Sequence, residues 1–171
     1  MLTVKLLRQT VCLLALSLIG WAQAAEPLVA HVFVALADNA HQGIVPVPAA
    51  LGDGDDLAKN LYWGAAYGVK TFFSKKAPGW KLEYCRDALS SAVLERCVFS
   101  TRHPPDAYLV ADAYRGQNIG DAMADFMAST AGRWALDESS PKDRPAIRLR
   151  APNGAALSIY VGHNGLMDPP L

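Results

Sequence analysis

Polar side chains that suit catalysis or binding lie directly after three apolar, strand-like segments of the sequence. These side chains are Asp38 and Asn39, then Asp112, Tyr114 and Arg115, and finally His163 and Asn164. A histidine at the exposed end of a strand suits a general base, because its pKa lies close to neutral. Nearby, an aspartate can orient the imidazole and an arginine can hold a carboxylate or a phosphate. The pattern predicts one polar crevice.

Each cluster also has a purely structural interpretation. His163 suits a turn histidine bonded to the backbone. Asp112 and Arg115 suit an ion pair that organises their loop, and Asp38 with Asn39 suits capping of the following turn. We take His163 as the candidate catalytic residue and the other six residues as candidate binding residues.

Other site chemistries find little support in the sequence. The histidines His31, His41, His103 and His163 are scattered without the spacing of metal ligands. The acidic run 51–56 lacks the later glycine and the closing glutamate of a calcium loop, so we interpret it as helix capping. The sequence contains no Gly-x-Ser-x-Gly turn and no glycine-rich phosphate loop. We predict no metal and no cofactor.

The first 24 residues (1–24) are typical of a secretory signal peptide. Lys5 and Arg8 precede the apolar stretch 11–19, and the segment 22–24 is a small-x-small cleavage site. An N-terminal membrane anchor is the alternative, but the apolar stretch is short for a membrane span. We predict cleavage after residue 24, a single domain over residues 25–171, and a periplasmic or secreted location.

Export affects how the cysteines are interpreted. Only Cys85 and Cys97 remain after cleavage, which is an even number in an oxidising compartment. A bridge between them would close a loop of about 13 residues and contribute on the order of 3 kcal/mol to stability. The alternative is a pair of buried free thiols, because Cys97 lies in an apolar strand-like run. We favour the disulfide.

Strand-like and helix-like segments alternate along the chain. We expect strands over 28–37, 93–101, 107–111, 147–150 and 156–162, and helices from residue 55 or 56 to residue 73 and over 118–132. We expect residues 80–91 to be helical or mixed and residues 137–145 to form a polar loop. This order predicts an α/β fold with a mostly parallel sheet and flanking helices. Ligands bind at the carboxyl ends of the strands in such sheets, where the three polar clusters lie.

Composition narrows the classes of protein. The chain has 171 residues, 51% of them hydrophobic, which is enough for one core. With 16 Lys+Arg against 16 Asp+Glu, it lacks the basic footprint of a nucleic-acid binder. Beyond the N-terminus no apolar run is long enough to span a membrane, so we expect no membrane contact after signal cleavage.

Several segments together resemble a family of exported bacterial proteins of unassigned function. They are 31–38 (HVFVALAD), 42–48 (QGIVPVP), 60–64 (NLYWG), 67–73 (YGVKTFF), 110–116 (VADAYRG) and 162–168 (GHNGLMD). The strand followed by His163-Asn164-Gly165 is also similar to the histidine corner of caspase- and gingipain-type cysteine peptidases. That second resemblance implies a caspase-like three-layer architecture.

The peptidase pattern needs a nucleophilic cysteine after the strand that follows the histidine. Here the sequence ends at Leu171, so we expect the last strand or strands and the nucleophile to be missing. Asn164 also stands where those peptidases usually have glycine, and Cys85 and Cys97 precede the histidine and do not fit the role. The resemblance thus implies the architecture without the mechanism.

Three hypotheses for function follow. The first is an exported, non-catalytic α/β domain that binds a small molecule or a protein partner, still unknown, at the carboxyl ends of its strands. The alternative is a caspase-like hydrolase with His163 as general base and a nucleophile from outside this chain. The third is an interaction protein whose exposed sheet edge pairs with a partner strand. None of them involves nucleic acid.

Overall fold

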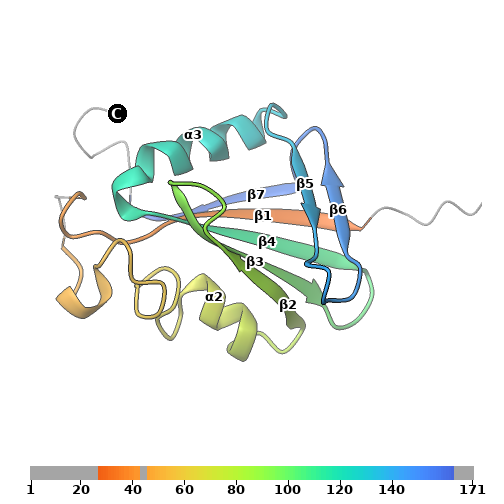
Figure 1. Cartoon of the computed structure of the whole chain (residues 1–171), viewed down its shortest axis with the longest axis horizontal. Coiled ribbons are helices and arrows are strands. Elements are labelled where there is room, and N and C mark those ends of the chain that lie inside the picture. The colour runs from red at the N-terminus through yellow and green to blue at the C-terminus, as the bar shows by residue number, and fades with distance from the viewer. Residues whose placement is uncertain (1–26, 43–45, 164–171) are drawn as a thin grey trace, which may run out of the picture.

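A five-stranded mixed sheet forms the centre of the molecule. The computed structural model describes residues 27–42 and 46–163. The strands of the sheet are β1 (Leu28–Ala35), β2 (Trp80–Asp87), β3 (Val93–Thr101), β4 (Ala107–Tyr114) and β7 (Leu157–Val161). They lie in the order β2-β3-β4-β1-β7 (Figure 1). Strand β1 pairs in parallel with β4 and β7, whereas β3 pairs antiparallel with β2 and β4.

Different segments cover the two faces of this sheet. Helix α3 (Ile119–Thr130) and the hairpin of β5 (Leu136–Ser139) and β6 (Arg148–Ala151) pack on one face, which we call the α3 face. The segment 49–76 packs on the other face, the α2 face. It begins with a 3₁₀ turn at Ala49–Leu51 and contains helix α2 (Val69–Thr71) and a π-helical turn at Phe72–Lys76. In Figure 1, α3 lies above the sheet and α2 below it.

Strand β1 is buried on both sides, as its continuous apolar sequence predicts. Val32 and Val34 belong to the core of the α2 face together with Trp63. Phe33 and Ala35 belong to the core under α3. Because successive side chains of a strand point to opposite faces, one short strand contributes to two cores.

The prediction of a mostly parallel sheet is wrong, because the sheet has two parallel and two antiparallel pairings. The error begins at residues 80–91, most of which form β2 instead of a helical or mixed stretch. The connections from β2 to β3 and from β3 to β4 are short, and short connections join antiparallel strands. The coarser prediction of an α/β fold is confirmed.

Two further segments differ from expectation. Residues 55–68 form a series of turns rather than a helix. A Cβ atom added to Gly64 would lie 2.3 Å from the carbonyl oxygen of Leu57, which shows how tightly the chain folds back there. Strand β5 begins just before the predicted loop 137–145 and extends into it. Its inward-facing Glu138 is charged, so the apolar alternation of a strand is hidden in the sequence.

The predicted disulfide between Cys85 and Cys97 is confirmed. The sulfur atoms are 2.01 Å apart, and the two cysteines face each other across β2 and β3. Residues 1–24 lie outside the described residues, so the signal peptide stays a prediction. Within the described ranges, no helix is long and apolar enough to cross a membrane.

Candidate functional site

The chain leaves β1 and β4 toward opposite faces of the sheet. After β1 it continues to the segment 49–76 on the α2 face, and after β4 it enters α3 through a 3₁₀ turn at Gly116–Asn118. The two strands are parallel neighbours, and Ala35 pairs with Tyr114 at their carboxyl ends. Open α/β sheets bind ligands at such a topological switch point. The residues that follow β1 and β4 therefore form the candidate binding site.

Asp38 and His41 form a hydrogen-bonded pair at this switch point. Asp38 Oδ2 lies 2.8 Å from His41 Nδ1, and Asp38 Oδ1 accepts the backbone N–H groups of Ala40 and His41. The aspartate side chain is buried, whereas the imidazole is 54% exposed. An ionised carboxylate only accepts hydrogen bonds, so Nδ1 carries the proton and Nε2 of the neutral ring is an acceptor. The loop thus presents an oriented imidazole.

Two glycines make room for Asp38. A Cβ atom on Gly116 would lie 2.2 Å from Asp38 Cβ, and one on Gly54 would lie 2.3 Å from Asp38 Oδ2. Any larger residue at either position would collide with the aspartate. The loops after β1 and β4 are therefore shaped around this one side chain.

Gln42 joins the loops that follow β1 and β4. Its side-chain amide donates hydrogen bonds to the carbonyl oxygens of Leu36 (2.8 Å) and Gly116 (2.9 Å). Its carbonyl oxygen accepts the backbone N–H of Asp38. Gln42 is fully buried, so these bonds satisfy an amide that would otherwise be costly to bury.

Asn60 fixes the same region from the α2 face. Its amide donates to the carbonyl oxygens of Ala37 and Asp53, and its oxygen accepts the backbone N–H of Ala37. Asn60 is also fully buried. Polar side chains buried to hold loop backbones are typical of preorganised sites, which need their supporting residues locked in place.

Asn39 and Arg115, both predicted to bind ligand, contact neighbouring loops. The Asn39 side chain exchanges two hydrogen bonds with the backbone of Val47, at 2.8 and 2.9 Å. Arg115 forms an ion pair with Asp55 and donates from Nε to the carbonyl oxygen of Ser91. These contacts fit the structural interpretation of both residues, although both stand at the switch point.

Asp112 and Tyr114 lie inside β4 and not beyond it. The strand continues to Tyr114, three residues past its predicted end, and both side chains face α3. Asp112 contacts His31 (Nε2 to Oδ2, 2.8 Å) and Arg96, so the imidazole beside it belongs to His31 and not to His163. The Tyr114 hydroxyl donates to Asp125 of α3. The structure thus separates these two residues from the switch point.

Around Asp112 the α3 face holds a buried cluster of charges. Burial by itself would raise the pKa of Asp112, but hydrogen bonds from Arg96 and His31 outweigh it and lower the pKa to about 2. Arg96 also binds Glu138 of β5, as does Arg86 of β2. Two arginines and two carboxylates balance in charge, and we interpret the cluster as the attachment of the β5–β6 hairpin to the sheet.

His163 follows β7, the edge strand of the described sheet. Its ring packs against Tyr62 with the ring centroids 5.8 Å apart, and its backbone carbonyl accepts a hydrogen bond from the Tyr160 hydroxyl. Among the described residues, no hydrogen bond or ring contact joins His163 to Asp38 or His41. Asn164 lies outside the described residues. The catalytic role of His163 stays a prediction.

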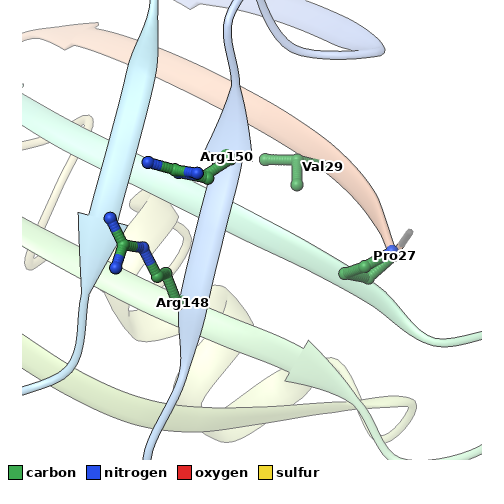
Figure 2. Close-up of a pocket in the computed structure, with 4 residues that line it drawn as sticks. All are labelled: Pro27, Val29, Arg148 and Arg150. Carbon is green, nitrogen blue, oxygen red and sulfur yellow. The ribbon is translucent and has the colours of Figure 1, made fainter.

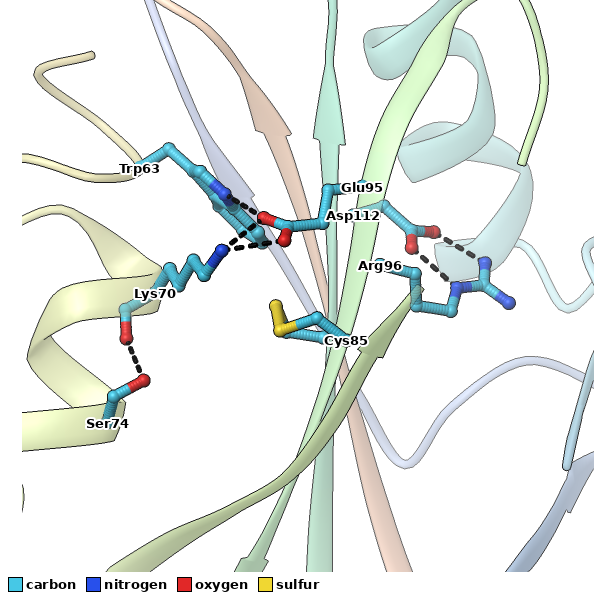
Figure 3. Close-up of a disulfide and its surroundings, with 8 residues drawn as sticks. Trp63, Lys70, Ser74, Cys85, Glu95, Arg96 and Asp112 are labelled. Carbon is cyan, nitrogen blue, oxygen red and sulfur yellow. Dashed lines mark hydrogen bonds and ion pairs between the residues drawn. A yellow bond between two sulfur atoms is a disulfide. The ribbon is translucent and has the colours of Figure 1, made fainter. Parts of the chain in front are cut away.

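A second charged cluster lies on the α2 face beside the disulfide. Glu95 is buried and accepts hydrogen bonds from Trp63 Nε1 (2.6 Å) and Lys70 Nζ (2.6 and 2.8 Å). Figure 3 shows this cluster on one side of the sheet and the pair of Arg96 and Asp112 on the other. Glu95 and Arg96, which are neighbours in β3, thus place a negative charge on the α2 face and a positive charge on the α3 face.

Glu95 and the two cysteines are a group of possible metal ligands within the described residues. One ligand atom from each of Cys85, Glu95 and Cys97 lies within 4.8 Å of the others. The two sulfur atoms are bonded to each other, and Glu95 already binds Lys70 and Trp63. The oxidised protein therefore offers no thiolate ligand here.

Sequence analysis missed three residues of the switch point, namely His41, Gln42 and Asn60. The spacing of Asp38 and His41, three residues apart just after a strand, was a usable signal. Asn60 is a polar residue inside the apolar segment 57–73, and such a residue often satisfies buried backbone groups. Gln42 follows His41 in a loop and carries no distinguishing pattern.

No family model, curated protein or solved structure matches this chain. The candidate site therefore depends on its own geometry. That geometry identifies the switch point, with its Asp38–His41 pair, as the candidate binding site.

Proposed function

We propose that this protein is an exported, non-catalytic α/β domain that binds a ligand or partner at the carboxyl ends of β4, β1 and β7. The observation that carries the proposal is the half-exposed His41 imidazole, which a buried aspartate orients at the switch point. Gln42 and Asn60 hold the surrounding loops in place. Since Nε2 accepts hydrogen bonds in the neutral ring, the ligand would offer an O–H or N–H donor.

The disulfide supports the exported location. Structural disulfides persist in oxidising compartments and are rare in the bacterial cytosol. The bond between Cys85 and Cys97 therefore agrees with a signal peptide over residues 1–24. We also propose a caspase-like architecture for this domain; its support is that β4, β1 and β7 are parallel and that His163 directly follows β7.

A ligand-observed NMR screen with small neutral donors, such as phenol and benzamide, tests this function. We expect some of them to bind the oxidised full chain and to lose most of their binding in His41→Ala. That substitution keeps the backbone bonds that Asp38 makes to its loop. The matched control is His103→Ala, an exposed histidine in the connection between β3 and β4. Equal binding to both variants would contradict the proposed site.

The hydrolase alternative has its own test. A set of fluorogenic peptide substrates and a thiol-directed acyloxymethyl ketone probe are incubated with the full chain and with His163→Ala. The proposal predicts neither turnover nor labelling. Hydrolysis that disappears in His163→Ala would replace the binding function with the catalytic one.

A further inference from the structure

The outer side of the β5–β6 hairpin carries two exposed arginines whose ion pairs with described residues are two long ones to Asp137. Arg148 and Arg150 alternate with the buried Leu149 and Ala151, so both point away from the sheet. Their side chains are 62% and 64% exposed. The hairpin therefore presents two guanidinium groups side by side on its surface.

Asp137 of β5 is the described acid that forms an ion pair with both guanidinium groups, but it makes a hydrogen bond to neither. Its Oδ2 atom lies 3.6 Å from Arg148 Nη2 and 3.8 Å from Arg150 Nε, which is beyond hydrogen-bond distance. Neither guanidinium donates a hydrogen bond to a described residue. Arginine donors in this state are available for a carboxylate or a phosphate, which they bind in bidentate fashion.

The surface of the whole hairpin region is positively charged. Its exposed basic residues are Arg133, Lys142, Arg144, Arg148 and Arg150. Only Asp137 and Asp143 are exposed acids there, because Glu138 is buried between Arg86 and Arg96. A surface of one sign attracts ligands of the opposite sign and raises their local concentration.

A hollow with apolar walls lies directly beside the two arginines. It has a volume of about 150 Å³ and is lined by Pro27, Val29, Arg148 and Arg150. Figure 2 shows the two arginines on β6, with Val29 and Pro27 at the start of β1. A neighbouring hollow of about 300 Å³ shares Pro27, Val29 and Arg150 and continues along Pro152. The two arginines thus line the same hollow as Pro27 and Val29, with their guanidinium groups extending toward β5.

We propose that this hollow is a second binding site, for a small organic anion with a phosphate or carboxylate head and an apolar body. The head binds between Arg148 and Arg150, and the apolar body lies over Pro27 and Val29. The site is at the amino end of β1, so it is separate from the switch point at the other end of that strand. A free metabolite and a lipid headgroup share this chemistry.

Calorimetric titration with phenyl phosphate and with inorganic phosphate tests the site on the oxidised full chain. We expect phenyl phosphate to bind at least about fivefold tighter, because its ring covers the apolar wall. In Arg148→Gln/Arg150→Gln its affinity should fall at least about tenfold, because both guanidinium donors are lost. Circular dichroism of each variant checks that the fold is intact.

The matched control is Lys142→Gln/Arg144→Gln, which removes the same charge from the connection between β5 and β6. We expect this control to weaken phenyl phosphate by less than about threefold, the effect of a changed net charge alone. An equal loss in both double variants would overturn the site in favour of diffuse attraction. Absence of phenyl phosphate binding to the unmodified chain would overturn it as well.

Vesicles distinguish the two sources of the anion. The unmodified chain and the Arg148→Gln/Arg150→Gln variant are sedimented with phosphatidylglycerol–phosphatidylcholine vesicles and with pure phosphatidylcholine vesicles. Arginine-dependent binding to the anionic vesicles that phenyl phosphate competes away supports the site and identifies a lipid headgroup. Phenyl phosphate binding without vesicle binding supports the site with a free anion. Anionic-vesicle binding that the Arg148→Gln/Arg150→Gln variant retains would overturn it.

Discussion

Arg96 and Asp112 place opposite charges in the middle of the sheet, where water does not reach them. Two hydrogen bonds of 2.6 Å join them, and both are almost fully buried. Such a pair adds little stability compared with apolar residues, but losing one partner leaves the other buried charge without the hydrogen bonds and the charge that balanced it. The intact pair therefore contributes little net stability, whereas the loss of one partner is expected to destabilise the fold.

Replacing Asp112 by asparagine tests this at a single residue. We expect Asp112→Asn to lower the free energy of unfolding by about 3 kcal/mol, because two arginines, Arg86 and Arg96, then face the single buried carboxylate of Glu138. Urea denaturation followed by circular dichroism measures the change. Asp106→Asn is the control, since Asp106 is exposed and the same substitution there should cost less than about 0.5 kcal/mol. A stable Asp112→Asn would contradict this account of the cluster.

The lowered pKa of Asp112 also predicts an acid dependence. The pKa is about 2 in the folded protein and about 4 in the unfolded chain, so the unfolded state binds the proton first. The resulting stabilisation, about 2 kcal/mol, is fully present above pH 4 and is lost as the pH falls toward 2. Denaturation curves across this range should show a steeper loss for the unmodified protein than for Asp112→Asn. Parallel curves would contradict the shifted pKa.

At the scale of elements, the β2–β3 hairpin depends on its disulfide. The bond closes a short loop and thereby reduces the entropy of the unfolded chain. We expect reduction to lower the free energy of unfolding by about 3 kcal/mol. A Cys85→Ala/Cys97→Ala variant should be similarly destabilised and should not respond to reductant. Unchanged stability of the reduced protein, with both thiols shown to be free, would contradict the prediction.

The sequence predicts well those elements in which apolar residues mark the buried side. Strands β1 and β3 and helix α3 are each close to their predicted bounds, because apolar residues mark their buried sides. Strands β2 and β5 were not predicted, because polar and charged residues make up half or more of each strand. Glu138 faces inward because it binds Arg86 of β2 and Arg96 of β3, and no local pattern in the sequence reveals such a pairing.

The same limit applies to the candidate site. The positions after β1 and β4 were predictable from the order of strands and polar residues. The sequence did not predict that Asp112 lies inside β4. Its partner Arg96, which neutralises its charge, comes from a neighbouring strand. The Asp38–His41 pair is local, and the three-residue spacing just after a strand is the feature of the sequence that indicates it.

Across the whole molecule, the two proposed sites lie at opposite ends of β1. The strand has eight residues, so roughly 26 Å of extended chain separates the Asp38–His41 end from the hollow beside Pro27. Sites so far apart without shared contacts are expected to act independently. The acidic loop at residues 53–56 and the arginines of the hairpin also make the two ends opposite in charge.

This independence is itself a prediction. His41→Ala should leave the affinity for phenyl phosphate within about twofold of the unmodified protein, since no partner is shared. Arg148→Gln/Arg150→Gln should likewise keep the binding of phenol and benzamide. Titration of each variant with both kinds of ligand measures the coupling. A large change in either direction would show that the two ends communicate.

The most direct test of the proposed function is to map where a neutral donor ligand binds. Two-dimensional ¹H–¹⁵N spectra of the oxidised full chain are recorded while the tightest-binding donor from the screen is added. The account predicts that the largest shifts occur at the amides of Asp38, His41, Gln42 and Gly116. Shifts confined to other regions, or shifts at these amides that persist in His41→Ala, would contradict recognition at the switch point.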